Sequence, residues 1–303
     1  MRHLKDFEYI EEIARTGSIR KAASDLNITS SALNKRVQAF EYEFGTPIFE
    51  RLPRGVRLNA AGEVLLQHIR GQAADFERVR MLVADMAGIH HGHVTVACSQ
   101  ALLQLFLPAQ ISKFRQNHPG VRFTVRTRDR AAAEQDLLTF SCDLACVFEP
   151  VYLADFEMLA MIEQPICAMM ASTHPLAQRN EILHLEDCLS FPHVIPTDGL
   201  GVRHLLELAT RHTNQRLMPV VEAESFEFMR RYVLLEDVIG FQIRIGLKNK
   251  ADSKWQVRGI SSKDIPPGHV FFGKLKDREL PIAAQRFAEH LAAELHMEAS
   301  RVP

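Results

Sequence analysis

Apolar residues recur every three or four positions over the first forty residues, a spacing that predicts helices with one buried face. The three stripes are Leu4, Phe7, Ile10 and Ala14; Ala22, Ala23 and Leu26; and Ala32, Leu33, Val37 and Phe40. Gly17 can end the first helix in a left-handed conformation, and Ser18 and Thr29 are N-cap residues for the second and third. Asn27 tolerates the turn between these two helices. The order of helix, short turn and helix predicts a helix-turn-helix.

The first turns of the third predicted helix are polar. In a helix-turn-helix these turns enter the major groove of DNA. Asn can make two hydrogen bonds to adenine, Lys can donate to guanine, and Ser can bond to a base or to phosphate. The alternative is that the same side chains form only the solvated face of a surface helix. The candidate DNA-binding residues on this helix are Thr29, Ser30, Ser31, Asn34, Lys35 and Arg36.

After Gly45 the sequence predicts a small β-hairpin, with a tight turn at Pro53 and Gly55 and a returning strand at 56–58. Three further candidate DNA-binding residues, Arg51, Arg54 and Arg57, would reach phosphates or a narrow minor groove from this wing. Residues 1 to 60 contain ten Lys/Arg and eight Asp/Glu, whereas the whole chain has a net charge of −1. Any attraction to nucleic acid must therefore be local.

Residues 60 to 86 contain no proline and carry an apolar ridge, which predicts a long helix with Asn59 as its cap. The ridge consists of Val64, Leu65, Ile69, Phe76, Val79, Leu82 and Val83. An isolated helix would leave this ridge in water, so we expect a partner helix. The alternative is that the ridge packs against its own chain.

Beyond a glycine-flanked hinge at 88–92, apolar strands alternate with helical stretches, which predicts parallel sheets covered on both faces. The expected strands are 94–98, 121–125 and 143–148 in a first set, and 193–196, 218–223 and 237–243 in a second. A strand at 269–275 and a helix at 281–296 would return to the first set. We therefore expect two α/β lobes.

Ligands of open α/β sheets bind beyond the carboxyl ends of the strands, so we expect a pocket in the crevice between the lobes. Ser99 and Gln100 end a strand and open a helix, where free backbone N–H groups favour an anion. For each candidate alone, ordinary capping or a solvated surface is the alternative. The candidate effector-binding residues are Ser99, Gln100, Thr127, Arg128, Phe148, Thr197, Gly201 and Ser225. Arg126 and Arg128 favour a small carboxylate or another anion.

Composition and motifs exclude several other classes. The 303 residues are 47% hydrophobic and 24% charged, enough for more than one core. No run of roughly 18 uncharged apolar residues occurs, so we expect no membrane span. The first ten residues include several charged ones where a signal peptide would be apolar, so we expect a cytoplasmic protein. The five cysteines are odd in number and lack CxxC spacing, which predicts buried, reduced thiols.

The sequence carries no sign of catalytic chemistry. The motifs GxGxxG, GxxxxGK[ST], HExxH and GxSxG are missing from it, so we expect no enzyme activity and no cofactor. His90, His91 and His93 lie in the hinge region, which fixes no ligand geometry, so we expect no metal site there.

Several segments together resemble the DNA-binding domain of the LysR-type transcriptional regulators. They are GSIRKAA at 17–23, LNIT at 26–29, GTPIFER at 45–51, RGVRL at 54–58 and AGE at 61–63. The resemblance covers nearly all of residues 1 to 65. This chain has Ser30, Asn34 and Asn59 where the family often has Gln, Ser and Thr. The first two departures lie on the predicted reading face, so they bear on base preference.

The resemblance implies an α/β protein with an all-α-type N-terminal winged helix-turn-helix and a C-terminal two-lobe, periplasmic-binding-protein-like (type II) effector domain. Its parts would be 1–59 for DNA binding, 60–87 for a dimerising linker helix, 88–92 for the hinge and 93–303 for the effector domain. Lobe 1 would span about 93–163 and 269–303, and lobe 2 about 164–268.

The resemblance also implies a transcriptional regulator that acts as a homodimer or homotetramer on a double-stranded DNA operator. A small-molecule effector, or co-inducer, would modulate it, and RNA polymerase is a candidate partner. Two alternatives stay open at this point: a cytoplasmic small-molecule binding protein, and a helix-turn-helix regulator of another family.

Overall fold

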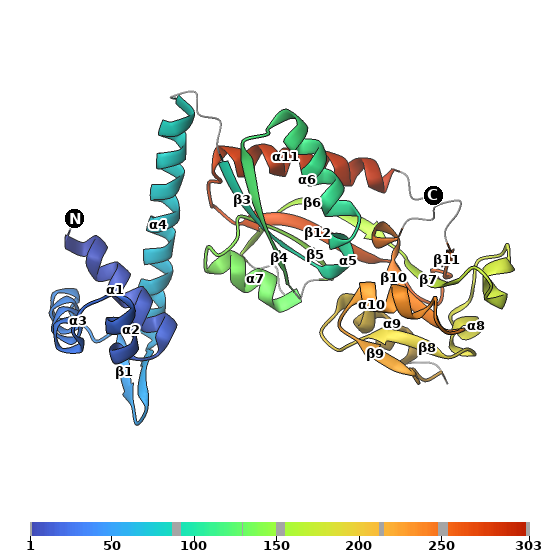
Figure 1. Cartoon of the computed structure of the whole chain (residues 1–303), viewed down its shortest axis with the longest axis horizontal. Coiled ribbons are helices and arrows are strands. Elements are labelled where there is room, and N and C mark those ends of the chain that lie inside the picture. Colours follow the sequence, from blue (N-terminus) through green and yellow to red (C-terminus); the bar gives the residue numbers. More distant parts are fainter. Residues whose placement is uncertain are drawn as a thin grey trace. The chain divides into compact units, whose positions relative to one another are not determined.

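The computed structural model describes residues 2–86, 92–128, 130–149, 155–211, 215–247 and 254–300 (Figure 1). The chain forms two compact units, Met1–Arg80 and Met81–Pro303. Among the described residues, no helix combines the length and the apolar character that a membrane crossing requires.

Of the three histidines near the hinge, at which we expect no metal site, His90 and His91 lie outside the described residues. His93 is described, and its Nε2 lies 2.9 Å from Thr124 Oγ1 on the neighbouring strand.

The first unit is a three-helix domain with a hairpin and the start of a long helix. Its elements are α1 (Arg2–Thr16), α2 (Ile19–Asp25), α3 (Ser30–Phe44), β1 (Phe49–Leu52), β2 (Gly55–Leu58) and α4 (Ala60–Met86). Gly17 adopts a φ of +63° after α1. The Ser18 side chain accepts from Lys21 N and the Thr29 side chain accepts from Ala32 N. These local signals confirm the predicted helix-turn-helix.

Two small cores hold the helices together. One consists of Ile10, Phe40, Ile48, Leu65 and Ile69, and the other of Ile13, Ala22, Ala23, Leu33 and Val37. The expectation that Ala32 is buried was wrong, because Leu33, Val37 and Phe40 define the buried face of α3 and Ala32 lies outside it, exposed.

The hairpin is fixed to the turn between α1 and α2. Val56 N donates to Gly17 O at 2.9 Å. Gly55 has a φ of +97°, and a Cβ built on it would lie 2.3 Å from that same Gly17 oxygen. A side chain at Gly55 would therefore push the hairpin away from the helices. On the other side, Asn59 Oδ1 accepts from Gly62 N and Asn59 Nδ2 donates to Pro47 O, both at 2.9 Å, which confirms the cap of α4.

The apolar ridge of α4 is divided. Leu65 and Ile69 pack into the first core, so this part of the ridge covers its own chain. Phe76, Val79 and Val83 are exposed. Their spacing of three and four residues places them on one side of the helix.

The second unit contains two five-stranded sheets. The first, lobe 1, has the strand order β4-β3-β5-β12-β6. Its strands are β3 (Gly92–Cys98), β4 (Val121–Thr127), β5 (Leu144–Phe148), β6 (Phe156–Gln164) and β12 (Gly268–Leu275). Its helices are α5 (Gln100–Leu103), α6 (Phe106–Asn117), α7 (Arg130–Leu138) and α11 (Ile282–Ala299). Helices α6 and α11 pack against one face of this sheet and α7 against the other (Figure 1).

The second sheet, lobe 2, has the order β11-β7-β10-β8-β9. Its strands are β7 (Ile166–Ala171), β8 (His193–Pro196), β9 (Val221–Ala223), β10 (Ile239–Ile243) and β11 (Trp255–Gly259). Its helices are η1 (Pro175–Gln178), α8 (Leu185–Leu189), α9 (Gly201–Arg211), α10 (Phe226–Tyr232) and η2 (Arg244–Gly246). All five cysteines are buried and free, as predicted.

Both sheets are mixed, which corrects the expectation of parallel sheets. In each lobe the three predicted strands pair in parallel, β4-β3-β5 and β9-β8-β10. The two remaining strands of each sheet pair antiparallel. Strands β6, β7 and β11 were not predicted from the sequence. The chain passes between the lobes at the ends of these strands. One passage is at Pro165 and the other lies between Gly259 and Gly268.

Candidate DNA-reading surface and effector pocket

The first turns of α3 form a polar surface, which we call the DNA-reading surface: Ser30, Ser31, Asn34 and Lys35. Asn34 is half-buried and the other three are exposed. None of the four makes an ion pair in the described parts of the chain. Thr29 has a different position, because its Oγ1 accepts from Ala32 N at 3.3 Å and lies 3.3 Å from Ser31 Oγ. Its hydroxyl therefore caps the helix that carries the surface.

Arg36, also predicted to contact DNA, lies toward the protein. Its Nη2 is 3.1 Å from Asp6 Oδ1 on α1, and Asp6 is buried. This ion pair ties α3 to α1. A buried carboxylate without its cation would be costly, so Arg36 has a role in the fold whatever it does at DNA.

The three wing arginines fall into two groups. Arg57 Nε donates to Glu50 Oε2 at 2.8 Å across the hairpin, where the two residues are register partners. Arg51 and Arg54 are exposed, and within the described ranges neither has an acidic partner. The positive charges of Arg51 and Arg54 are thus not compensated by a neighbouring carboxylate in the described residues, and these two arginines can bind an external anion.

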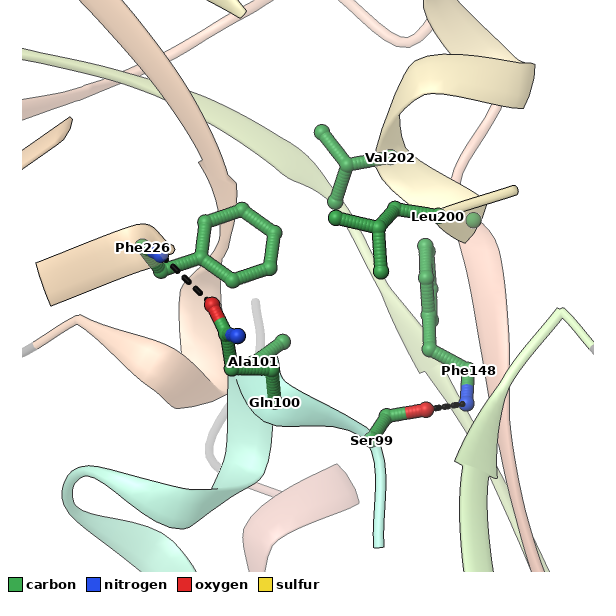
Figure 2. A pocket seen from close by; sticks show the side chains of 8 residues that line it. Ser99, Gln100, Ala101, Phe148, Leu200, Val202 and Phe226 are labelled. Carbon is green, nitrogen blue, oxygen red and sulfur yellow. Dashed lines mark hydrogen bonds between the residues drawn. The ribbon is translucent and has the colours of Figure 1, made fainter. Parts of the chain in front are cut away.

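A small cavity in the second unit brings together four of the predicted effector residues: Ser99, Gln100, Phe148 and Gly201. Figure 2 shows Ser99, Gln100 and Phe148 with Leu200, Val202 and Phe226 around the same space. Ser99 and Gln100 follow β3, and Phe148 ends β5, so these come from lobe 1. Gly201 opens α9 and Phe226 opens α10, so these come from lobe 2. The cavity therefore lies between the lobes.

The polar groups of this cavity bond to one another. Ser99 Oγ accepts from Phe148 N at 3.0 Å, and Gln100 Oε1 accepts from Phe226 N at 2.6 Å, as the dashed lines in Figure 2 mark. The cavity measures about 10 Å³, which is room for roughly one water molecule. We call this arrangement, in which Gln100 links lobe 1 to lobe 2 across a narrow cavity, the closed form.

Gly201 makes the close approach of the lobes possible. A Cβ built on Gly201 would lie 2.7 Å from Phe148 Cδ1 and 2.8 Å from the Phe148 carbonyl oxygen. No real Cβ tolerates such distances, so any larger residue would separate α9 from β5 or displace Phe148.

The other four predicted effector residues do not line the cavity. Thr127 is exposed, and Thr197 is half-buried with its N–H donating to Ala223 O at 3.2 Å. Arg128 Nε donates to Asp136 Oδ2 at 2.7 Å. Ser225 is the N-cap of α10 and accepts from Phe228 N at 3.2 Å. For these positions the structure shows capping, pairing or surface exposure.

Arg126 and Arg128, which we expected to attract an anionic effector, both lie beside Asp136. Arg126 Nη1 lies 3.8 Å from Asp136 Oδ2, the same atom that binds Arg128. In addition, α5 has only four residues, so its dipole is small.

Four lining residues were not predicted from the sequence: Ala101, Leu200, Val202 and Phe226. They give the cavity an apolar wall. Each is the direct sequence neighbour of a predicted residue, and this proximity is the only sign by which the sequence could have pointed to them.

The residue before Ser99 is a buried cysteine that does not line the cavity. Cys98 precedes Ser99, is fully buried and lies beside Cys146 in the parallel register of β3 and β5. Burial raises the pKa of the Cys98 thiol well above its ordinary value, so it stays protonated. Groups of His, Cys, Asp and Glu suited to a metal ion do not occur among the described residues.

Comparison with known proteins identifies the domains. Residues 4–63 match the model of the bacterial regulatory helix-turn-helix proteins of the lysR family, and residues 87–296 match the LysR substrate binding domain. The HTH-type transcriptional activator CmpR of Synechocystis sp. is 24% identical over 294 residues, which are 96% of this chain and 95% of CmpR.

Two solved structures share the fold. Full-length CbnR complexed with its target DNA has a TM-score of 0.64 at 14% identity, covering 96% of this chain and 99% of that one. The effector binding domain of QuiR in complex with shikimate has a TM-score of 0.58 at 19% identity, covering 68% of this chain and 98% of that one. With both domain models matched in order along its length, the chain belongs to the LysR family of transcriptional regulators.

Proposed function

We propose that this LysR-family regulator reads base pairs with Ser30, Ser31, Asn34 and Lys35 while Arg51 and Arg54 bind the flanking phosphates. The observation that carries the proposal is that these side chains are solvent-accessible and, within the described residues, have no acidic partner, whereas neighbouring Arg36 and Arg57 are held by Asp6 and Glu50. A side chain already bound to a carboxylate must give up that bond to contact DNA. The side chains without such a bond are therefore the ones we assign to DNA contacts, α3 to the bases and the wing to the phosphates.

The exposed ridge of α4 supports a homodimer. Phe76, Val79 and Val83 are large apolar side chains on one side of a helix, and a second copy of α4 would cover them. Two reading surfaces would then dock in successive major grooves, and two dimers would form a tetramer on a longer operator. RNA polymerase would be contacted by this assembly, and we expect no catalysis by the chain itself.

The effector would enter between the lobes, where it must enlarge a closed cavity. Phe148, Leu200, Val202 and Phe226 offer it an apolar surface, and the N–H groups now bound by Ser99 and Gln100 offer it hydrogen bonds. We therefore favour a small, compact molecule with one or two acceptor oxygens. QuiR, of the same fold, was solved with shikimate. By differential affinity for the open and closed forms, such a ligand shifts the balance by ~1 to 3 kcal/mol.

The DNA proposal is tested with a duplex enriched from a random library by the full chain. Asn34→Ala and Lys35→Ala should each lose ~1 to 3 kcal/mol of binding free energy at particular base pairs of that duplex. The matched control is Glu43→Gln in the last turn of α3, where the side chain is also exposed. Equal losses on every duplex sequence would refute base reading.

The pocket is tested by a thermal-shift screen of small organic molecules on the full chain. A bound molecule raises the unfolding temperature, because binding adds RT ln(1 + [L]/Kd) to stability. Ser99→Ala should weaken the shift caused by a hit while leaving DNA affinity unchanged. A hit whose shift is the same in Ser99→Ala as in the wild type would place the effector elsewhere.

A further inference from the structure

Lobe 2 contains a second and much larger hollow. It is a groove of about 340 Å³ lined by the edge strand β11 and by residues 180–182. Ligand sites commonly occupy roughly 300 to 1,000 Å³, so the groove has the volume for a small molecule. We propose that it binds small organic carboxylates with an apolar body, at a site separate from the crevice between the lobes.

Two guanidinium groups line the groove, from Arg244 after β10 and Arg258 on β11. Several other arginines of lobe 2 are paired with acids, among them Arg179 with Asp187, Arg203 with Glu207, and Arg230 with Glu227. Arg244 and Arg258 make no ion pair within the described ranges. Guanidinium groups match carboxylates through paired N–H donors, so two arginines that line one hollow and lack an acidic partner suit an oxyanion.

The electrostatic balance of the groove favours an anion. Glu181 also lines it, but two cations face that single carboxylate. Arg258 Nη2 donates to the backbone oxygen of Glu181 at 3.0 Å, which holds the guanidinium at the wall of the groove without neutralising it. Arg244 N donates to Pro165 O at 3.1 Å, so the backbone that carries the second guanidinium is also fixed.

The remaining wall is apolar. Ile182 lines the groove and is 69% exposed, so a ligand in the groove has apolar surface there to cover. Val257 and Ile260 also line the groove, and a Cβ built on Gly259 would meet nothing within 4 Å. An apolar ligand body would cover Ile182 and fill the free space beside Gly259.

The groove lies where the chain passes between the lobes. Pro165 is the link from β6 to β7, and Ile260 and Ser262 belong to the link from β11 to β12. A ligand that contacts both links can favour one arrangement of the lobes over another. This coupling to the effector pocket rests on the proposed function, whereas binding in the groove does not.

The test uses isothermal titration of the full chain with phenylacetate as the probe and with 2-phenylethanol as its neutral analogue. Phenylacetate should bind and 2-phenylethanol should bind at least tenfold more weakly. Arg244→Gln should weaken phenylacetate roughly tenfold to a hundredfold, the effect of losing a charged hydrogen-bonding partner. Arg286→Gln, an exposed arginine on α11, is the matched control and should leave the affinity unchanged.

Two further variants separate the groove from the crevice. Ile182→Ser should weaken phenylacetate and leave inorganic phosphate unchanged, because only the apolar body contacts Ile182. Ser99→Ala should leave phenylacetate binding intact. Phenylacetate binding that is lost in Ser99→Ala but kept in Arg244→Gln would overturn the groove and support the crevice. No binding of phenylacetate to the folded wild type would also overturn the groove, while leaving the DNA proposal untouched.

Discussion

The DNA-reading surface and the pocket between the lobes satisfy their polar groups in opposite ways. On α3, Lys35 is exposed and Asn34 is half-buried, and the helix that carries them is capped by Thr29. Between the lobes, the side chains of Ser99 and Gln100 bind backbone N–H groups of the protein itself. A partner that docks on a rigid surface needs no rearrangement there. A ligand that enters a closed cavity must first replace the protein's own bonds.

The largest effect that would sharpen this comparison is expected from Gly201→Ala. The new Cβ would meet the Phe148 ring and carbonyl at under 3 Å, and overpacking of this kind costs ~1 to 3 kcal/mol. The closed form should lose that much stability, although Ala is the better helix former. Trp255, the single tryptophan, is buried in β11 and reports the unfolding of this unit by fluorescence in denaturant titrations.

Gly259→Ala is the control for that change, because a Cβ at Gly259 meets nothing within 4 Å. It should leave the unfolding midpoint of the unit nearly unchanged. DNA affinity of Gly201→Ala should match the wild type, since the reading surface belongs to the other unit. If Gly201→Ala unfolds at the wild-type denaturant concentration, the lobes do not depend on this contact and the pocket is not closed as described.

A smaller effect is expected from Arg54→Ala on the DNA side. Loss of one phosphate contact should flatten the slope of log K against log salt by about 0.9. Between 50 and 200 mM salt, the variant should therefore lose roughly threefold less affinity than the wild type. Arg57→Ala should change the slope less, because Glu50 already binds that guanidinium at 2.8 Å. The measurement is fluorescence anisotropy of a labelled duplex over a salt series. Equal slopes for Arg54→Ala and the wild type would remove Arg54 from the phosphate contacts.

The same contrast explains which features could be predicted from the sequence. Gly17, Ser18, Thr29 and Asn59 act on backbone groups within a few residues, so their roles follow from local rules, and the structure has each cap where it was expected. The three parallel strands of each lobe were predictable for a similar reason. Continuous apolar runs separated by helices are a local pattern.

What the sequence left out depends on contacts between distant residues. Arg128 looked free because Asp136 is its partner only once α7 lies beside β4, and Arg36 looked free because Asp6 lies on another helix. Phe226 lines the pocket, and its N–H donates to Gln100, which is 126 positions away in the sequence. Side-chain type gives no sign of such pairings.

The smallest expected effect is a dependence of stability on pH that is confined to the unit with the pocket. His174 is completely buried there; its Nδ1 accepts from Leu176 N at 3.2 Å, and its Nε2 has no hydrogen-bond partner among the described residues. Burial lowers the pKa of His174 below its ordinary 6.5, partly offset by the charge of Asp237. Burial likewise lowers the pKa of His290.

Because the unfolded chain then binds protons at a higher pH than the native state, the stabilisation is complete above about pH 6.5 and declines as the pH falls below it. The free energy of unfolding, followed through Trp255 from pH 7.5 to 5, should therefore decrease, and His174→Asn should flatten the decrease while keeping an acceptor for Leu176 N. The control His68→Asn changes an exposed histidine of the DNA-binding unit and should leave the curve as it is. A His174→Asn curve as steep as the wild type would mean that other groups carry the pH dependence, and that the buried imidazole adds nothing to the difference between the two units.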